Sequence, residues 1–326
     1  MTIPPRWRSR EAGLLGLILL LLAAIAMVFP RFLSPASLSG VLDDTALLVL
    51  LALGEMLVLL TRGVDLSIAA NLALTGMVVA LLNQAHPGWG VTPVILLSIG
   101  LGAALGAFNG VLIWLLRIPS IVVTLGTLSV YRGSVYLASG GRWVNSNQMS
   151  PAFLGLVRER LLGLTMLTWI AIACAILTGL FLRQTMRGRD LYAAGNNPSA
   201  AVYAGIDVGR MQFIAFTIAG AIAGLCGYLW VSRFAVAYTD VASGFELQVI
   251  AACVIGGISI TGGVGTVAGV VLGALFLGII KNALPLVGIS PFFQMAVSGA
   301  VITGAVVINA RAATGVSRRI LESSAT

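Results

Sequence analysis

The chain has 326 residues, of which 59% are apolar and 9% are charged, with a formal net charge of +8. Soluble domains carry about 25% charged residues, so this composition excludes an ordinary cytosolic protein, a disordered chain and a disulfide scaffold. A bilayer-spanning helix needs about 20 apolar residues, and the apolar content provides for roughly ten such helices. We therefore expect an all-α polytopic membrane protein with about ten transmembrane helices, in which residues 1–326 form a single transmembrane domain and residues 13–309 its membrane region.

Ten apolar runs follow one another along the chain. They cover residues 13–29, 46–60, 68–82, 91–116, 118–138, 164–182, 213–231, 247–260, 264–280 and 292–309. The first run follows a basic segment and resembles a secretory signal peptide, but its length favours an uncleaved helix. Several later runs are short or interrupted by glycine and polar residues, which in transporters is typical of segments that line a pathway.

Arginine residues are distributed unevenly between the connections. If the N-terminus is cytoplasmic, most of them lie in the tails and connections on the cytoplasmic side. Because positive charge is retained inside, and an even number of spans returns the chain to its starting side, we expect both termini in the cytoplasm. No basic stretch is long enough to predict nucleic-acid binding, which the net charge alone would suggest.

Two connections are long: residues 139–163, expected outside, and residues 183–212, expected inside. The second contains Asn196-Asn197-Pro198-Ser199, a helix-start signal with Asn at the cap and Pro in the first turn. The signal predicts a short helix over residues 199–204 that ends at Gly205. On the cytoplasmic surface such a helix would serve to dock a partner. A plain loop with a chance cap is the alternative, and local signals leave both open.

Glycines recur every four residues in two of the runs. They are Gly102, Gly106 and Gly110 in the fourth run, and Gly265, Gly269 and Gly273 in the ninth. This spacing puts bare backbone on one helix face and predicts close approach of a neighbouring helix. Because the fourth and ninth runs would cross in opposite directions, the two triads also suggest an inverted repeat.

Known catalytic and metal-binding patterns are absent from the sequence. Cys174, Cys226 and Cys253 lie inside apolar runs, and the one histidine, His86, lies in a predicted loop. These residues cannot build a usual zinc or di-metal site, and no Ser–His or paired intramembrane Asp arrangement for hydrolysis is present. The glycine-rich segment 256–265 lacks the lysine of a phosphate-binding loop. We expect no metal, no cofactor and no ATPase or other enzymatic activity in this chain.

A few polar residues lie at or near membrane depth, where a carboxylate is costly and indicates a pathway or a pairing residue. The candidates for a pathway or gate are Glu55, Asp65, Ser67, Asn71, Asn109 and Glu246. We expect Asp65 to pair with Arg62 or to cap the third span through Ser67, and Glu55 to face the pore or a partner subunit. The alternative is that these side chains serve packing alone.

Several ordered motifs resemble the membrane subunits of bacterial ribose-type ABC sugar importers. The motifs are Leu53-Gly54-Glu55-Met56, residues 61–67, residues 74–76, Asn109-Gly110, residues 118–127, Tyr131-Arg132-Gly133, and residues 244–247 with 250–257. Residues 183–212 are similar to the family's cytoplasmic coupling loop, and the resemblance assigns ATPase coupling to Gly195, Asn196, Asn197, Pro198, Ala200, Ala201 and Gly205.

The resemblance implies a permease subunit in the bacterial inner membrane. It would pair with a second permease subunit, an ATP-binding subunit with two nucleotide-binding domains, and a periplasmic sugar-binding protein. The Ala69-Ala70-Asn71 stretch looks like that of rhamnose importer permeases, with autoinducer-2 or another pentose or hexose as the alternative substrate. An exporter permease and a secondary transporter are further alternatives, although the few carboxylates disfavour ion coupling.

Overall fold

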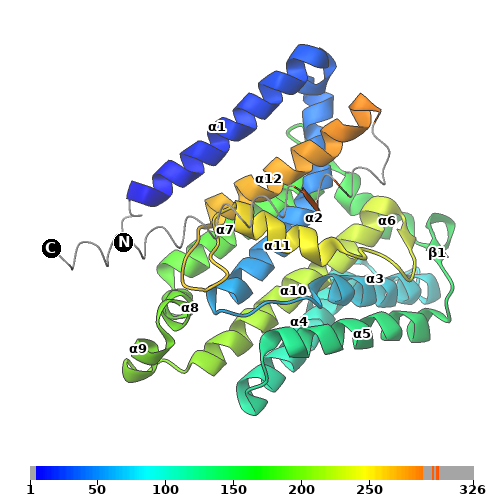
Figure 1. Ribbon diagram of the computed structural model, residues 1–326. Coiled ribbons are helices and arrows are strands. Elements are labelled where there is room, and N and C mark those ends of the chain that lie inside the picture. The colour runs from blue at the N-terminus through cyan, green and yellow to red at the C-terminus, as the bar shows by residue number, and fades with distance from the viewer. Residues whose placement is uncertain (1–4, 289–295, 297–298, 301–326) are drawn as a thin grey trace.

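The computed structural model describes residues 5–288, 296 and 299–300 (Figure 1). The long helices are α1 (Pro5–Val28), α2 (Pro35–Leu60), α3 (Ile68–Ala85), α4 (Val91–Leu116), α5 (Ser120–Ser139), α7 (Met166–Gln184), α10 (Val208–Phe234) and α12 (Val267–Ala283). Shorter helices are α6 (Pro151–Gly155), α8 (Met186–Asn196), α9 (Pro198–Tyr203) and α11 (Phe245–Ile255). The described residues are thus almost wholly helical, which confirms the all-α fold class.

Four two-residue strands form two antiparallel pairs in the connections. β1 (Val144–Asn145) pairs with β4 (Val236–Ala237), and β2 (Arg160–Leu161) pairs with β3 (Leu164–Thr165). The first pair joins the connection after α5 to the connection after α10, and Trp143 lies against Tyr238 beside it, with ring centroids 5.4 Å apart. Figure 1 shows β1 and α6 at one end of the bundle and α8 and α9 at the other.

Seven helices in the described part of the chain are long and apolar enough to cross a membrane. They comprise Arg10–Val28, α3, α4, α5, α7, α10 and Val267–Leu286. The expected ten spans are therefore not all reproduced. The run at 292–309 lies outside the described residues, and the run at 247–260 is shortened to α11 because the chain turns at Gly257, whose φ of +85° favours glycine. The run at 46–60 belongs to α2, the most central helix of the bundle.

The bundle is arranged around α2 and α10. α10 packs against α2, α3 and α4, while α2 also packs against α7, α11 and α12 (Figure 1). Two pairs of contacts correspond to each other. α4 packs against α10 in the way that α12 packs against α2, and α3 packs against α10 in the way that α11 packs against α2. A repeat in which α2, α3 and α4 correspond to α10, α11 and α12 predicts this reciprocity, so the packing supports an internal repeat of the kind that the glycine triads suggest.

A glycine seam, formed by Gly102 and Gly106 of α4 with Gly220 and Gly224 of α10, joins the two helices with the most extensive contact. A Cβ built on Gly106 would overlap the carbonyl oxygen of Phe216, and one on Gly102 would overlap that of Gly220. The predicted close approach is confirmed. In the second triad, Gly269 and Gly273 of α12 contact α11 in the same manner.

Gly265, the three cysteines and His86 were also considered in the sequence, and the structure locates each of them. Gly265 lies before α12 and against Ile258, so it is not part of that helix face. Only Gly269 and Gly273 of the second triad lie on the helix. The three cysteines are free thiols, two of them buried. His86 follows α3 and is exposed, with its ring stacked on Trp89 at 5.4 Å.

Candidate functional site

The α2–α3 connection, residues 61–67, is a non-helical segment that lies inside the bundle. α2 ends at Leu60, and the chain reverses through Arg62, which has a left-handed backbone with φ of +65°. The N–H of Gly63 then bonds back to the carbonyl of Val58 at 3.1 Å. This tight reversal turns the chain back along α2, so that Asp65 lies beside Glu55, ten residues earlier.

A polar chain of Glu55, Asp65, Ser67, Asn109 and Tyr131 runs from α2 through this connection to α4 and α5. The Asp65 N–H donates to Glu55 Oε1 at 3.1 Å, and Asp65 Oδ1 accepts from the Ser67 N–H at 2.9 Å and the Ser67 hydroxyl at 2.6 Å. Ser67 Oγ in turn accepts from Asn109 Nδ2 at 2.8 Å, and the Tyr131 hydroxyl lies 3.4 Å from Asn109 Oδ1. All five side chains are buried.

This geometry answers the expectations for the two carboxylates. Asp65 does hydrogen-bond Ser67 at the start of α3, as expected, but it does not pair with Arg62, whose guanidinium is used elsewhere. Glu55 lies fully buried within the subunit rather than on a surface facing a pore or partner, because the reversal after α2 brings the Asp65 N–H to its carboxylate. Burial raises the pKa of Asp65 to about 6, and its hydrogen bonds from Ser67 oppose that rise.

Two other predicted residues lie outside the polar chain. Asn71, one turn further along α3, donates to the carbonyl of Gly102 on α4 at 3.1 Å and so joins α3 to the glycine seam. Glu246 lies half-buried in the first turn of α11, where it interacts electrostatically with Arg132 of α5. Tyr131 was missed as a site residue, although a tyrosine within an apolar run is a signal, since a buried hydroxyl needs a partner.

Residues 183–212, the expected coupling loop and called the coupling segment below, contain two short helices, α8 and α9, rather than one. Thr185 caps α8, its hydroxyl accepting from the Gly188 N–H at 2.9 Å, and this helix was not predicted. Asn197 caps α9, its Oδ1 accepting from the Ala200 N–H at 3.1 Å, and Gly205 follows with φ of +80°. The short capped helix is thereby confirmed, with bounds shifted by one residue.

The C-terminal end of α8 is packed directly against the end of α2. A Cβ on Gly195 would overlap the carbonyl oxygen of Leu60, which leaves no room for a side chain. Arg62 Nε donates to the Gly195 carbonyl at 2.7 Å, and its Nη2 donates to the Asn196 carbonyl at 3.2 Å. In addition, Tyr192 of α8 donates to the carbonyl of Gly265 at 2.9 Å. Gly195 thus faces inward, whereas Asn196 is exposed and contributes only its backbone carbonyl to this contact.

The outer side of α9 is exposed. Ala201 is buried, whereas Val202 and Tyr203 are 62% and 93% exposed, respectively. Apolar and aromatic side chains of this kind are common at the cores of protein interfaces. Sequence reasoning missed these two residues, because it followed the residues that shape the helix.

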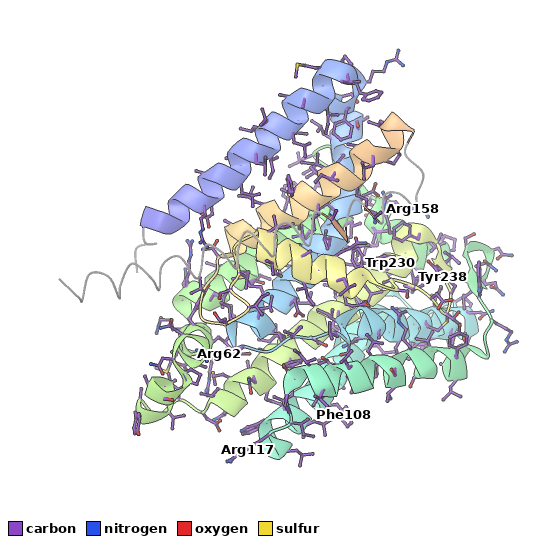
Figure 2. The ribbon with its side chains drawn as sticks, viewed as in Figure 1. Arg62, Phe108, Arg117, Arg158, Trp230 and Tyr238 are labelled. Carbon is purple, nitrogen blue, oxygen red and sulfur yellow. The ribbon has the colours of Figure 1, made fainter. Side chains whose placement is uncertain are left out.

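A groove of about 990 Å³ separates the α4–α5 connection from the α9–α10 connection at this end of the bundle. It is lined by Arg62, Ile113, Trp114, Arg117, Ile118, Pro119, Ser120, Ile121, Val202, Gly205, Ile206, Asp207, Val208, Gly209 and Gln212. Figure 2 shows Arg62 and Arg117 at this end. The groove therefore separates α9 from the α4–α5 connection on this side.

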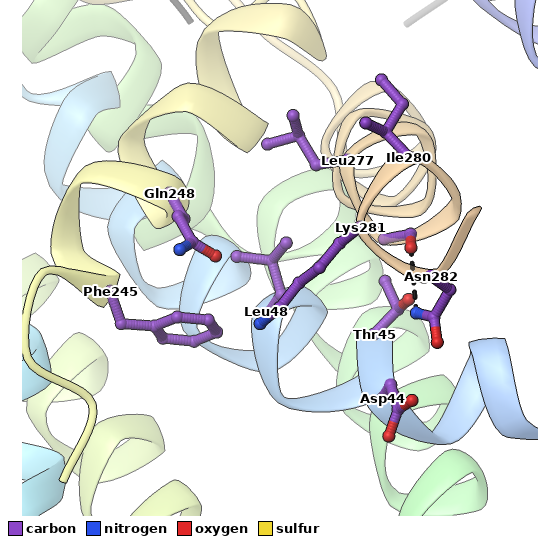
Figure 3. Close-up of a pocket in the computed structure, with 10 residues that line it drawn as sticks. Asp44, Thr45, Leu48, Phe245, Gln248, Leu277, Ile280, Lys281 and Asn282 are labelled. Carbon is purple, nitrogen blue, oxygen red and sulfur yellow. Dashed lines mark hydrogen bonds between the residues drawn. The ribbon is translucent and has the colours of Figure 1, made fainter. Parts of the chain in front are cut away.

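A much smaller pocket, with room for about one water molecule, lies between α2, α11 and α12 (Figure 3). Lys281 lies over the ring of Phe245, with its Nζ 5.8 Å from the ring centroid, and Gln248 projects toward the same space. Its volume of about 30 Å³ is too small for a monosaccharide, so the pocket as it stands is not a substrate site.

Comparison with known proteins finds a family match and several relatives. Residues 37–306 match the family described as "Branched-chain amino acid transport system / permease component". The chain is 36% identical to an autoinducer 2 import system permease protein LsrC from Enterobacter sp. (strain 638), over 93% of this chain and 88% of that protein. It is 34% identical to the protein of that name from Salmonella typhi, over 96% and 89% of the two chains, and 35% identical to the one from Klebsiella pneumoniae, over 93% and 87%. No solved structure matches it.

Proposed function

The chain belongs to the branched-chain amino acid transport system / permease component family, and on that premise we propose that it is the membrane subunit of an ATP-driven importer of autoinducer-2. The observation that carries this proposal is the similarity to autoinducer-2 import permeases over more than nine-tenths of the chain. The relatives favour this substrate over rhamnose, which the Ala69-Ala70-Asn71 stretch had suggested. The subunit is a multi-pass membrane protein and carries no catalysis of its own.

The proposal includes the rest of a binding-protein-dependent importer. An ATP-binding subunit with two nucleotide-binding domains supplies the energy, a periplasmic binding protein delivers the substrate, and a second permease subunit completes the path. Residues 1–326 act as one transmembrane domain in the bacterial inner membrane, with both termini in the cytoplasm and no cofactor in this chain. The apolar helices and the family support this arrangement.

In this proposal α8 and α9 form the contact with the ATP-binding subunit. The exposed Val202 and Tyr203 enter that partner, while Gly195 and Asn196 hold the segment against the end of α2. The alternative of a secondary transporter is disfavoured by the similarity to autoinducer-2 import permeases and by the small number of buried carboxylates among the described residues.

The test is uptake into proteoliposomes that contain the whole complex with loaded binding protein. We expect ATP-dependent accumulation of autoinducer-2 that excess unlabelled autoinducer-2 suppresses, while rhamnose and ribose do not. Uptake driven by an ion gradient without ATP would contradict an ABC importer. Competition by rhamnose alone would restore the rhamnose assignment.

Orientation is tested separately. Reporter fusions at Gly140 and Asn196 should report the periplasm and the cytoplasm, respectively, since these residues lie at opposite ends of the bundle (Figure 1). The same side for both would rule out the proposed topology.

A further inference from the structure

The α2–α3 connection is bonded to many surrounding helices. Gln212 of α10 donates to the Thr61 carbonyl at 3.2 Å. The Val64 N–H donates to Ser120 Oγ at 3.1 Å, and Thr124 Oγ1 donates to the Val64 carbonyl at 3.2 Å, both on α5. Arg62 also bonds α8, and the polar chain connects Asp65 to α2 and Ser67 to α4. Residues 61–67 therefore contact five helices.

Within the connection, Arg62 faces the coupling segment. Its backbone is left-handed, a conformation that costs energy for a residue other than glycine and persists where the surroundings impose it. Its stem lies on Gly262, where an added Cβ would meet Arg62 Cγ, and its guanidinium bonds the last carbonyls of α8. Positive charge at a helix C-terminus is favourable, so the side chain is held to α8 by charge as well as by hydrogen bonds.

The groove gives α9 and the α9–α10 connection space to move relative to the α4–α5 connection. The first turn of α10, in contrast, stays packed on α4 through Gly209 and Trp114. On its other side the coupling segment is tied to Arg62. A displacement of α8 and α9 is therefore passed to the α2–α3 connection, in which Asp65 lies three positions after Arg62.

We propose that Arg62 is the positioning residue that couples movement of the α8–α9 segment to the polar chain, an inference that rests on the proposed function. When the ATP-binding subunit moves α8 and α9, Arg62 shifts with the carbonyls of Gly195 and Asn196. The shift alters the hydrogen bonds that Asp65 makes with Glu55 and Ser67, and through Asn109 it reaches α4. The transport path thereby responds to the nucleotide, although the polar chain does not contact the ATP-binding subunit.

The test compares Arg62→Gly with Arg117→Gly. Both arginines have a left-handed backbone, with φ of +65° and +54°, and both line the groove, but only Arg62 has a hydrogen bond to the coupling segment among the bonds of the described residues. Glycine suits this backbone, so neither variant strains the fold, and the pair isolates the contacts that the Arg62 side chain makes with α8 and Gly262.

In the complete complex, we expect Arg62→Gly to lower binding-protein-stimulated ATP hydrolysis, relative to unstimulated hydrolysis, and uptake by about tenfold, and Arg117→Gly to keep both. Amide hydrogen exchange of residues 61–67 gives a readout that a purely structural role would not move. In the wild-type complex ATP should change their protection, and in Arg62→Gly this response should disappear.

Equal uptake and equal exchange responses in the two variants would overturn the role of Arg62. So would a wild-type complex that transports while residues 61–67 do not respond to ATP. A wild-type complex without ATP-dependent uptake would instead overturn the proposed function, and the inference with it.

Discussion

The glycine seam between α4 and α10 and the α2–α3 connection are two close contacts made by different means. In the seam, Gly102 and Gly106 bring backbone against backbone, and the contact has no side chain that could adopt a second arrangement. In the connection, residues 61–67 form hydrogen bonds with polar side chains on α2, α4, α5 and α10 and with a backbone carbonyl of α8. Hydrogen bonds can exchange partners at small net cost, whereas closely packed backbone atoms cannot be rearranged without steric strain. The seam is suited to a fixed scaffold, and the connection to a moving part.

The largest effect is expected in the seam. Gly106→Leu places a side chain where even a Cβ would overlap the Phe216 carbonyl, so α4 and α10 cannot approach and the bundle should fail to form. The control is Gly100→Leu on the same helix, where a Cβ meets no atom within 4 Å. Size-exclusion chromatography in detergent should show a single peak for the control only. A folded Gly106→Leu protein would show that the seam is adaptable.

A smaller effect is expected in the connection. Asp65→Ala removes the acceptor of both Ser67 bonds and should cost about 2–3 kcal/mol, since hydrogen bonds to a charged group are worth more than neutral ones. The protein should fold with a lower thermal midpoint and lose most uptake. Asp65→Asn keeps an oxygen for Ser67 and should retain more of both. Full uptake by Asp65→Ala would remove the polar chain from the mechanism.

The cap of α9 is expected to matter less. Asn197→Ala removes the side-chain acceptor of the Ala200 N–H and should cost about 1 kcal/mol. Because the helix is short, we expect about fivefold weaker binding of the ATP-binding subunit, measured by titration of the purified subunit. Asn197→Ser also caps a helix and serves as the control. Loss of binding in both variants would point to a direct contact by Asn197 instead of a cap.

The smallest effect is expected at Glu55. Glu55→Gln keeps an oxygen to accept the Asp65 N–H, so uptake should stay within about twofold of wild type, because the polar chain needs the acceptor and not the charge. Glu55→Leu has a similar size without an acceptor, and should be clearly worse. A large loss in Glu55→Gln would indicate that the charge itself acts during transport.

Local contacts were predictable from the sequence and distant ones were not. The bonds of Ser67 to Asp65 span two residues, and the cap of α9 spans three, so residue type and spacing suffice to suggest them. Arg62, in contrast, bonds residues more than 130 positions away. The sequence offered Asp65 as its nearest partner, and that expectation was wrong because the left-handed turn at Arg62 directs its side chain toward α8.

The membrane helices show the same limit. Apolar runs located each long helix among the described residues, since hydrophobicity needs no tertiary information. They overestimated the helix at 247–260, because a run of apolar residues continues past Gly256-Gly257 whereas the helix does not. They also missed α8, whose polar sequence gives no apolar signal and which is begun by the cap at Thr185.

The shortness of α11 bears on the thickness of the barrier itself. Its 11 residues extend about 16 Å, roughly half of the ~30 Å hydrocarbon layer of a bilayer. The non-helical residues 256–266 follow it, and where such backbone lies at membrane depth its peptide groups must be shielded from lipid by protein. Part of that shield is the end of α2, where the Gly263 N–H bonds the Leu60 carbonyl at 3.0 Å. α11 alone is therefore too short to cross the hydrocarbon layer, and the segment that follows it depends on neighbouring helices for its cover.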